Sequence, residues 1–308
     1  MSASEGSPTA VPGRPIDGHQ KVKKAFSCRD FGVSGETFDL WEAPGGYRFT
    51  HPVPENIGRY YESHSYLSHH SDEAGLMPAL YRLARSGNIM WKKRLLHHYL
   101  QKSGSTDGRL RLLDFGCGTG QFAQSCAKNG WDTSGIETDT DASLRASEPG
   151  GLKIYPNFES IPAGEAETGF AVITAWHVLE HVPQPGKTLK AFYNHLKPGG
   201  IAVIAVPNFH SFDAQFYGEM WAGYDVPRHL HHFTPGFLNE LAAGQGFRSI
   251  GLHRMLLDTF FVSLLSEQYA GSGVFGSLRA ITTGLLSNIS ALRDVRRSSA
   301  FAAVFQKV

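Results

Sequence analysis

The chain has 308 residues, a formal net charge of +1, 41% hydrophobic residues and 19% charged residues. This length and composition predict a folded protein with a substantial core and exclude a disordered chain. A net charge this close to zero gives no reason to expect a nucleic acid as a partner. The three cysteines (Cys28, Cys117 and Cys126) follow no disulfide pattern, which is typical of a cytoplasmic protein. We expect neither a secretory signal nor a membrane span, because no apolar run is suitable for either.

The first 108 residues are expected to precede the main domain. Residues 1–25 are rich in Ser, Pro, Gly and Lys and lack large apolar side chains, so we expect a disordered tail. Residues 26–108 begin with aromatic residues among Gly and Pro, a pattern that predicts short strands and turns. Two helical patterns follow, at about 75–86 and 89–101. A polar stretch then leads into a domain that spans residues 109–308.

The most informative stretch of the chain reads LLDFGCGTGQF. An apolar run ends on Asp114, and three glycines alternate after it, at Gly116, Gly118 and Gly120. Glycine accepts backbone angles that a Cβ forbids, so a buried strand can turn sharply into a helix here. A ligand can then lie directly on the backbone beside the start of that helix. The dinucleotide fingerprint G-x-G-x-x-G needs a glycine where Gln121 stands, which argues against a nicotinamide cofactor.

From residue 110 onward, strand and helix patterns alternate, which predicts a mostly parallel sheet with crossover helices. The second strand ends on Glu137, about twenty residues after the glycines, where an acid can accept both ribose hydroxyls of a bound adenosine. Two further phrases follow in order, LEHV at 179–182 and LKPGG at 196–200. The second of them leads into IAVIAVPN, a continuous apolar run typical of a central strand.

These four landmarks together resemble the class I S-adenosylmethionine-dependent methyltransferases, and the glycine stretch resembles their motif I. The pattern is similar to bacterial small-molecule methyltransferases of the ubiquinone type. The resemblance implies an α/β fold with a Rossmann-like, seven-stranded, mostly parallel sheet and helices on both faces. It also implies an N-terminal helical cap and a helical hairpin inserted at about 258–295, before the last strand.

The implied activity is methyl transfer from S-adenosyl-L-methionine to an oxygen or carbon of a small-molecule acceptor, in a biosynthetic pathway. A nicotinamide-dependent oxidoreductase and a cofactor-binding protein without catalysis are the alternatives. The resemblance also assigns cofactor contacts residue by residue. The expected cofactor-binding residues are Asp114, Gly116, Cys117, Gly118, Gly120, Phe122, Glu137, Thr138, Asn157, Phe158, Glu159, Trp176 and His177.

We expect no metal site. Related bacterial methyltransferases often carry a zinc-ribbon-like element with paired cysteines near residues 26–54, but here Cys28 stands without its partners, and four ligands cannot be assembled. In ubiquinone-type enzymes the segment that matches 177–181 resembles a divalent metal site. His177 replaces an acid of that site, and a hard ion such as Mg²⁺ prefers oxygen ligands.

Two histidine groups are candidates for the base that takes the proton of the acceptor. In WHVLEHV, a predicted helix start, His177, Glu180 and His181 would share one helical face. The second group lies in DVPRHLHHF, at 225–233, for which the alternative is a hydrogen-bonded loop. The expected catalytic residues are His229 and, next in line, His181. The expected substrate-binding residues are Tyr66, His69, Asp225, Arg228 and His232.

The hairpin near the C-terminus has large apolar residues at helical spacing on both of its arms. We expect it to pack into the core or against a second copy in a homodimer, or to cover an apolar substrate. Binding to a membrane surface is less expected, because the polar face lacks a stripe of Lys and Arg.

Overall fold

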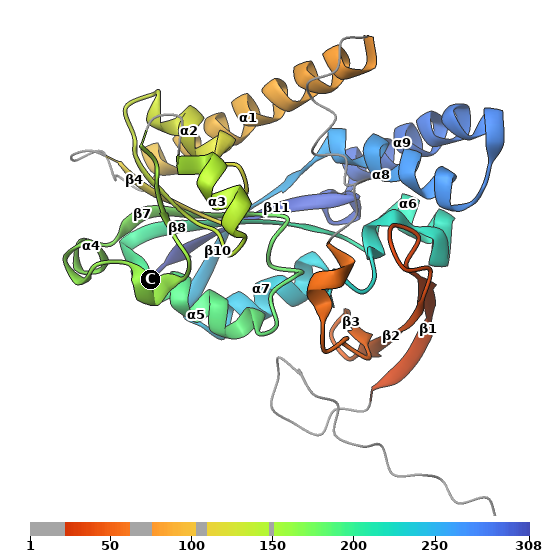
Figure 1. Ribbon diagram of the computed structural model, residues 1–308, viewed down its shortest axis with the longest axis horizontal. Coiled ribbons are helices and arrows are strands. Elements are labelled where there is room, and N and C mark those ends of the chain that lie inside the picture. The colour runs from red at the N-terminus through yellow and green to blue at the C-terminus, as the bar shows by residue number, and fades with distance from the viewer. Residues whose placement is uncertain (1–21, 62–75, 103–109, 148–150) are drawn as a thin grey trace, which may run out of the picture.

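A computed structural model describes residues 22–61, 76–102, 110–147 and 151–308, with only the backbone described for 76–85 and 102. Its centre is a seven-stranded sheet with the order β10-β11-β8-β7-β4-β5-β6 (Figure 1). Strand β11 runs antiparallel to both of its neighbours, and the other pairs are parallel. The strands are β4 (Arg111–Phe115), β5 (Asp132–Ile136), β6 (Lys153–Tyr155), β7 (Phe170–Trp176), β8 (Leu196–Pro207), β10 (Phe247–Arg254) and β11 (Ala300–Lys307). The predicted Rossmann-like fold is confirmed.

Helices cover both faces of this sheet (Figure 1). Phe192 of α5 and Phe237 of α7 pack on one face, and Leu96 of α1 and Cys126 of α2 pack on the other. The centre of β8 is buried on both faces, as its continuous apolar run predicts. The helices that flank the sheet are α1 (Leu76–Lys102), α2 (Gln121–Ala127), α3 (Thr140–Ser147), α4 (Ala163–Thr168), α5 (Pro185–His195) and α7 (Pro235–Ala243).

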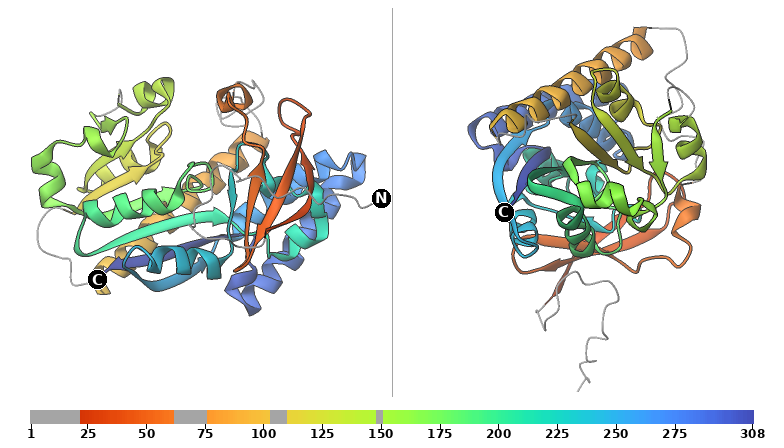
Figure 2. Two further views of the ribbon diagram at one scale, coloured as in Figure 1. Left: turned by 90° about the horizontal axis from the view of Figure 1, so that it is seen from below. Right: turned by 90° about the vertical axis from the view of Figure 1, so that its left-hand side faces the viewer.

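A second, smaller sheet stands beside the main one (Figure 2). Its antiparallel order is β1-β2-β3-β9, with β1 (Lys23–Arg29), β2 (Thr37–Ala43), β3 (Tyr47–His51) and β9 (His231–His232). Together with α6 (Phe212–Tyr217) it encloses an aromatic core around Phe38, Tyr60 and Trp221. Cys28 belongs to this core, and burial raises the pKa of its thiol to about 12. The N-terminal strands thus pair with residues 225–233, which we term the histidine segment and which lie about 180 residues later in the chain.

Two local predictions were wrong. The two helical patterns before the main domain form one continuous helix, α1, because Gly87 inside it costs only about 1 kcal/mol. The predicted helix at WHVLEHV is absent: β7 ends at Trp176 and α5 begins only at Pro185. Proline suits the first turn of a helix but not its interior, so a helix that started earlier would have to contain Pro183 and Pro185.

Between β10 and β11 the chain forms a helical hairpin of α8 (Leu256–Tyr269) and α9 (Gly276–Arg293). Gly271 and Gly273 have φ angles of 65° and 60° in the connecting turn, a conformation that favours glycine. Within the described part of the chain, no helix combines the length and the apolar character that crossing a membrane requires.

A buried carboxylate fixes this hairpin to the rest of the protein. Asp213 of α6 is fully buried, and it accepts hydrogen bonds from the Trp221 indole (2.8 Å) and the Ser287 and Ser299 hydroxyls (both 2.6 Å). Its partners lie on the loop after α6, on α9 and just before β11. One side chain therefore joins three segments that are distant in the sequence.

We predict that Asp213→Ala lowers the free energy of unfolding by about 3 kcal/mol or more, because three buried donors lose their acceptor. Chemical denaturation measures this change. Asp132→Ala is the control, since its half-exposed carboxylate faces Arg111 at 3.5 Å and its removal should cost less than about 1 kcal/mol. Equal losses in the two variants would contradict the anchoring role of Asp213.

Candidate functional site

The turn from β4 into α2 is shaped by its glycines. The N–H groups of Gly116 and Cys117 both donate to the carbonyl of Ile136 on the neighbouring strand, at 2.8 and 3.1 Å. Gly118 has a φ of 52°, and a Cβ built on it would meet no atom within 4 Å. The space over Gly118 is therefore open, so a ligand can lie directly against the backbone there.

Glu137 lies against this turn from the end of β5. Its carboxylate accepts the Gly118 N–H at 2.7 Å through one oxygen and the Asp139 N–H at 2.9 Å through the other. Each carboxylate oxygen has a second lone pair, so a diol placed over the turn can still donate to it. The open glycine and this carboxylate together fit the ribose of an adenosyl group.

Two charged side chains lie close to the glycine turn. Asp114 is buried and accepts a hydrogen bond from the Thr174 hydroxyl at 2.6 Å, and burial raises the pKa of its carboxyl to about 6. The ammonium of Lys92 on α1 lies 4.3 Å from the centre of the Trp176 ring. Burial lowers the pKa of Lys92, while the negative charge of Asp114 acts in the opposite direction. Sequence reasoning missed Lys92, because a lysine in a helical pattern usually indicates a solvated face.

The three residues expected near an adenine ring, Asn157, Phe158 and Glu159, differ in their burial and contacts. Phe158 packs on Phe115, with ring centroids 5.5 Å apart, and is half-buried. Asn157 uses its side chain to accept the Ser160 N–H at 3.0 Å, while Glu159 is exposed. Of the other expected cofactor contacts, Thr138 is exposed and Phe122 is buried, at the edge of the Trp176 ring. Their contact with a cofactor stays a prediction.

The loop after β7 lies directly on the glycine turn. A Cβ on Gly116 would come within 2.5 Å of the Val178 side chain, so only glycine permits this approach. His177, the residue before Val178, has a φ of 57°, and its side chain lies between two carboxylates. Its ring nitrogens are 3.0 Å from Asp258 of α8 and 3.5 Å from Glu180. Burial opposes a charge on His177, but the two acids outweigh it and raise its pKa to about 10.

Glu180, His181 and His229 converge beside His177. Glu180 is buried, and neither of its carboxylate oxygens has a hydrogen-bond partner among the described residues. His181 Nδ1 lies 3.0 Å from the Arg228 carbonyl and His229 Nδ1 lies 2.9 Å from the Gly223 carbonyl. A carbonyl can only accept, so both Nδ1 atoms carry a proton.

This arrangement permits two kinds of chemistry. Burial and the neighbouring His229 lower the pKa of His181 to about 4, so its imidazole is neutral and can accept a proton. The donor atoms of Glu180, His181 and His229 also lie within 4.8 Å of one another and could hold a divalent cation. Two imidazoles and a carboxylate form a ligand set that suits Zn²⁺ better than Mg²⁺. The predicted absence of a metal stays a prediction.

The histidine segment is held by buried contacts. Arg228 forms a two-bond ion pair with Asp225 (3.0 and 2.6 Å), contacts Asp30 at 3.2 Å and donates to the Tyr60 carbonyl at 3.0 Å. His232 is buried and meets the Thr50 hydroxyl at 3.0 Å. This arrangement matches the hydrogen-bonded loop that the sequence offered as the alternative for residues 225–233. Substrate contact by Asp225, Arg228 and His232 stays a prediction, and burial leaves Arg228 and His232 little surface to offer.

The comparisons with known proteins agree with this geometry. The family model "Methyltransferase domain" matches residues 84–251, more than half of the chain. The chain belongs to the methyltransferase domain family. The resemblance to class I S-adenosylmethionine-dependent methyltransferases is therefore confirmed, and S-adenosyl-L-methionine is the cofactor that this family uses.

Individual relatives of this methyltransferase domain match over part of their length. The ubiquinone biosynthesis O-methyltransferase of Psychrobacter arcticus is 32% identical over 160 residues, which cover 46% of this chain and 62% of that protein. The protein of the same name from Bordetella avium is 31% identical over 165 residues, which cover 50% and 68%. A solved S-adenosylmethionine-dependent methyltransferase from Archaeoglobus fulgidus aligns with a TM-score of 0.44 at 20% identity, over 70% of this chain and 94% of that one. The chain thus matches about three-fifths of the length of the first of these relatives.

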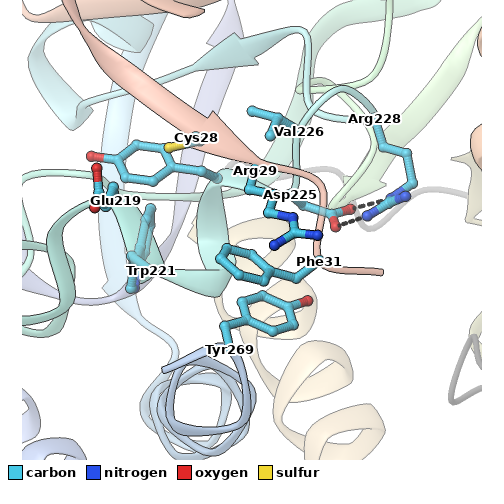
Figure 3. Close-up of a pocket in the computed structure, with 10 residues that line it drawn as sticks. Cys28, Arg29, Phe31, Glu219, Trp221, Asp225, Val226, Arg228 and Tyr269 are labelled. Carbon is cyan, nitrogen blue, oxygen red and sulfur yellow. Dashed lines mark hydrogen bonds and ion pairs between the residues drawn. The ribbon is translucent and has the colours of Figure 1, made fainter. Parts of the chain in front are cut away.

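A small cavity lies beside the histidine segment of the methyltransferase domain (Figure 3). It is bordered by Phe31, which stacks on Tyr269 of α8 at 4.7 Å, and by the Asp225–Arg228 ion pair. Its volume of about 10 Å³ suffices for one water molecule and no cofactor. The cavity is therefore a packing feature between the small sheet and the hairpin.

Two predicted substrate residues, Tyr66 and His69, lie outside the described residues. Immediately before them, Tyr61 is partly exposed, and its hydroxyl lies 3.1 Å from His181 Nδ1. Sequence reasoning did not place Tyr61 or Asp258 in the site. No motif marks either residue, and each reaches the site through tertiary packing.

We predict that Asp258→Asn lowers the pKa of His177, because one of its two anionic partners is lost. Since that pKa is raised from 6.5, the charged pairing stabilises the fold fully below about pH 6.5 and is lost as the pH rises through about 10. An NMR titration of the His177 ring proton measures the change. Asp294→Asn is the control, since Asp294 pairs with Arg296 in the turn after α9. An unchanged titration in Asp258→Asn would reject the contact.

Proposed function

We propose that this protein transfers a methyl group from S-adenosyl-L-methionine to an oxygen or carbon of a small-molecule acceptor. The observation that carries the proposal is the close approach of Val178 to Gly116, which places the loop with His177, Glu180 and His181 against the glycine turn. When bound, the cofactor supplies a methyl group activated by a positively charged sulfur. The protein then has to align the acceptor and accept its proton.

Different residues near the glycine turn would bind different parts of the cofactor. The open backbone at Gly118 and the carboxylate of Glu137 suit the adenosyl ribose. The ammonium of Lys92 suits a carboxylate, and Asp114 suits an ammonium group, which are the two charges of an amino acid. Lys92 lies beside Trp176 at the end of β7, and Asp114 bonds to Thr174 of the same strand, where the methionyl part of the cofactor would reach the acceptor.

The proton acceptor in this proposal is the His181–His229 pair, whose rings lie 4.6 Å apart. His181 is neutral and less buried than His229, so it is the better placed of the two to meet an acceptor. His177 carries a positive charge and therefore cannot serve as the base. Its charge instead favours an acceptor that becomes anionic as it loses its proton.

Oxygen is the favoured acceptor atom, because the two relatives described above are O-methyltransferases by name. Gln121 argues against a nicotinamide cofactor, because it stands where the dinucleotide fingerprint needs a glycine. A measurement of turnover distinguishes an enzyme from a cofactor-binding protein without catalysis. A pairing of two copies remains an expectation from the sequence, and the experiment on the hairpin below measures it.

We predict that Gly118→Ala weakens S-adenosyl-L-methionine binding by about tenfold or more, because its methyl group enters the space above the turn. Isothermal titration calorimetry measures the affinity. Gly130→Ala is a matched control: its φ is 85°, its Cβ would also meet nothing within 4 Å, and it lies at the far end of α2. Both variants carry the same kind of backbone strain, so only the loss of affinity should differ. Full affinity in Gly118→Ala would reject the turn as the cofactor site.

We predict that His181→Ala and His229→Ala each lower the turnover number by about 10²-fold, the usual effect of losing a general base or its direct neighbour. Cofactor affinity should stay unchanged, since the adenosyl contacts lie elsewhere. His98→Ala, an exposed histidine on α1, should keep full activity. If both variants retained wild-type turnover and an unchanged pH–rate profile, the proton would have another acceptor, whereas lost cofactor binding would point to a damaged fold.

A further inference from the structure

The α8/α9 hairpin has an inverted distribution of side chains. Its inner positions hold small and polar residues, although helix pairs in water usually bury their large apolar ones. The buried residues of α8 are Thr259, Ser263, Ser266 and Glu267. The buried residues of α9 are Gly276, Ala280, Thr283, Gly284, Ser287 and Ala291.

Eleven large apolar residues of the hairpin are exposed, and we term them the outer face. It consists of Leu256, Leu257, Phe261, Val274, Phe275, Leu278, Ile281, Leu285, Leu286, Ile289 and Leu292. Val274 and Phe275, in the turn between the helices, are 95% and 80% exposed. Exposed large apolar residues are normally scattered singly over a surface, so eleven of them on one hairpin mark an interaction site.

The contacts between α8 and α9 resemble those of helices that pair in lipid. Gly276, Ala280 and Gly284 repeat at intervals of four residues, and a Cβ on Gly284 would come within 2.7 Å of the Phe260 ring. A hydrogen bond from the Thr259 hydroxyl to the Asn288 side chain, at 3.0 Å, joins the two helices. Small residues at close approach, polar bonds inside and large aliphatic residues outside are the features of helix pairs in an apolar environment.

The charges around the outer face are mostly positive at the surface. Four arginines belong to the hairpin and the turn after it: Arg279, Arg293, Arg296 and Arg297. The acids are Glu267, Asp258 and Asp294, whose side chains are 4%, 19% and 36% exposed. Glu267 pairs with Arg279 and Asp294 with Arg296, which leaves Arg293 and Arg297 as the arginines without an acid of this group as partner. Arginines beside an apolar surface are attracted to anionic headgroups.

A second copy of the chain fits the outer face less well. Arg279, Leu286 and Arg293 are seven residues apart and lie on one flank of α9. A two-fold pairing of two α9 helices about their midpoint would place Arg279 of one copy beside Arg293 of the other, so that like charges meet. Headgroups of a lipid surface would instead pair with both arginines.

We propose that the outer face docks on a lipid surface that contains anionic phospholipids. The hairpin would lie in the plane of the interface, with the α8/α9 turn and the outward side chains among the acyl chains and the arginines at the headgroups. α9 has 18 residues, which gives the docked face a length of about 27 Å. α8 and α9 lie side by side at one end of the molecule, so the main sheet does not obstruct this docking (Figure 1).

Vesicle co-sedimentation of the full chain tests this proposal, with vesicles of phosphatidylcholine alone or mixed with phosphatidylglycerol. We expect binding to the mixed vesicles and a fall of about tenfold or more in the Val274→Ser/Phe275→Ser and Leu285→Ser/Ile289→Ser variants. Leu144→Ser, at an exposed position on α3, is the matched control and should bind like the wild type. Arg293→Gln/Arg297→Gln should weaken binding to the mixed vesicles only.

Light scattering on the same proteins separates the alternatives. The proposal requires a monomer in solution whose mass the four variants leave unchanged. A wild-type dimer that dissociates in the Leu285→Ser/Ile289→Ser variant would assign the face to a second copy and overturn the proposal. Failure of the wild type to bind either vesicle would also overturn it. The turn residues are so exposed that their substitution should leave the fold intact, and calorimetry with S-adenosyl-L-methionine checks this without any need for catalysis.

Discussion

The arrangement of the site depends on one buried arginine. The guanidinium of Arg228 joins Asp225 of its own segment, Asp30 at the end of β1 and the carbonyl of Tyr60. A buried charge that loses a partner costs several kcal/mol, so these three contacts hold one another in place. The small sheet and the histidine segment therefore form one unit. That unit is fixed to the main sheet, and His229 therefore lies beside His181, in the loop that packs on the glycine turn.

Burial lowers the pKa of both His177 and His181, and their partners decide the outcome. His177 faces two carboxylates, so its pKa rises to about 10 and it is charged at neutral pH. His181, four residues later, is buried beside another imidazole, and its pKa falls to about 4. One short loop thus presents a fixed cation and a neutral acceptor side by side. Enzymes commonly separate the roles of similar groups in this way.

The hairpin connects this chemistry to the outside of the protein. Asp258, in the first turn of α8, contacts His177, while the opposite side of the same two helices presents the apolar outer face. Asp213 holds α9 against α6 and β11, so the hairpin is anchored rather than loosely attached. A surface that engages the outer face therefore acts on an element in direct contact with the site.

Local patterns were enough to predict the succession of strands along the chain, the glycine turn and the position of Glu137 at the end of a strand, because strand–turn–helix signals and the special backbone angles of glycine are local properties. The helix expected at 177–181 failed, since the choice between a loop and a helix was made by prolines further on and by Val178 packing on Gly116. Lys92 and Asp258 reached the site through contacts that no local pattern records. In the hairpin, periodicity revealed an apolar stripe on α9 but not the direction it faces. That direction depends on tertiary packing, because the small residues Ala280 and Gly284 allow α8 to approach from the other side.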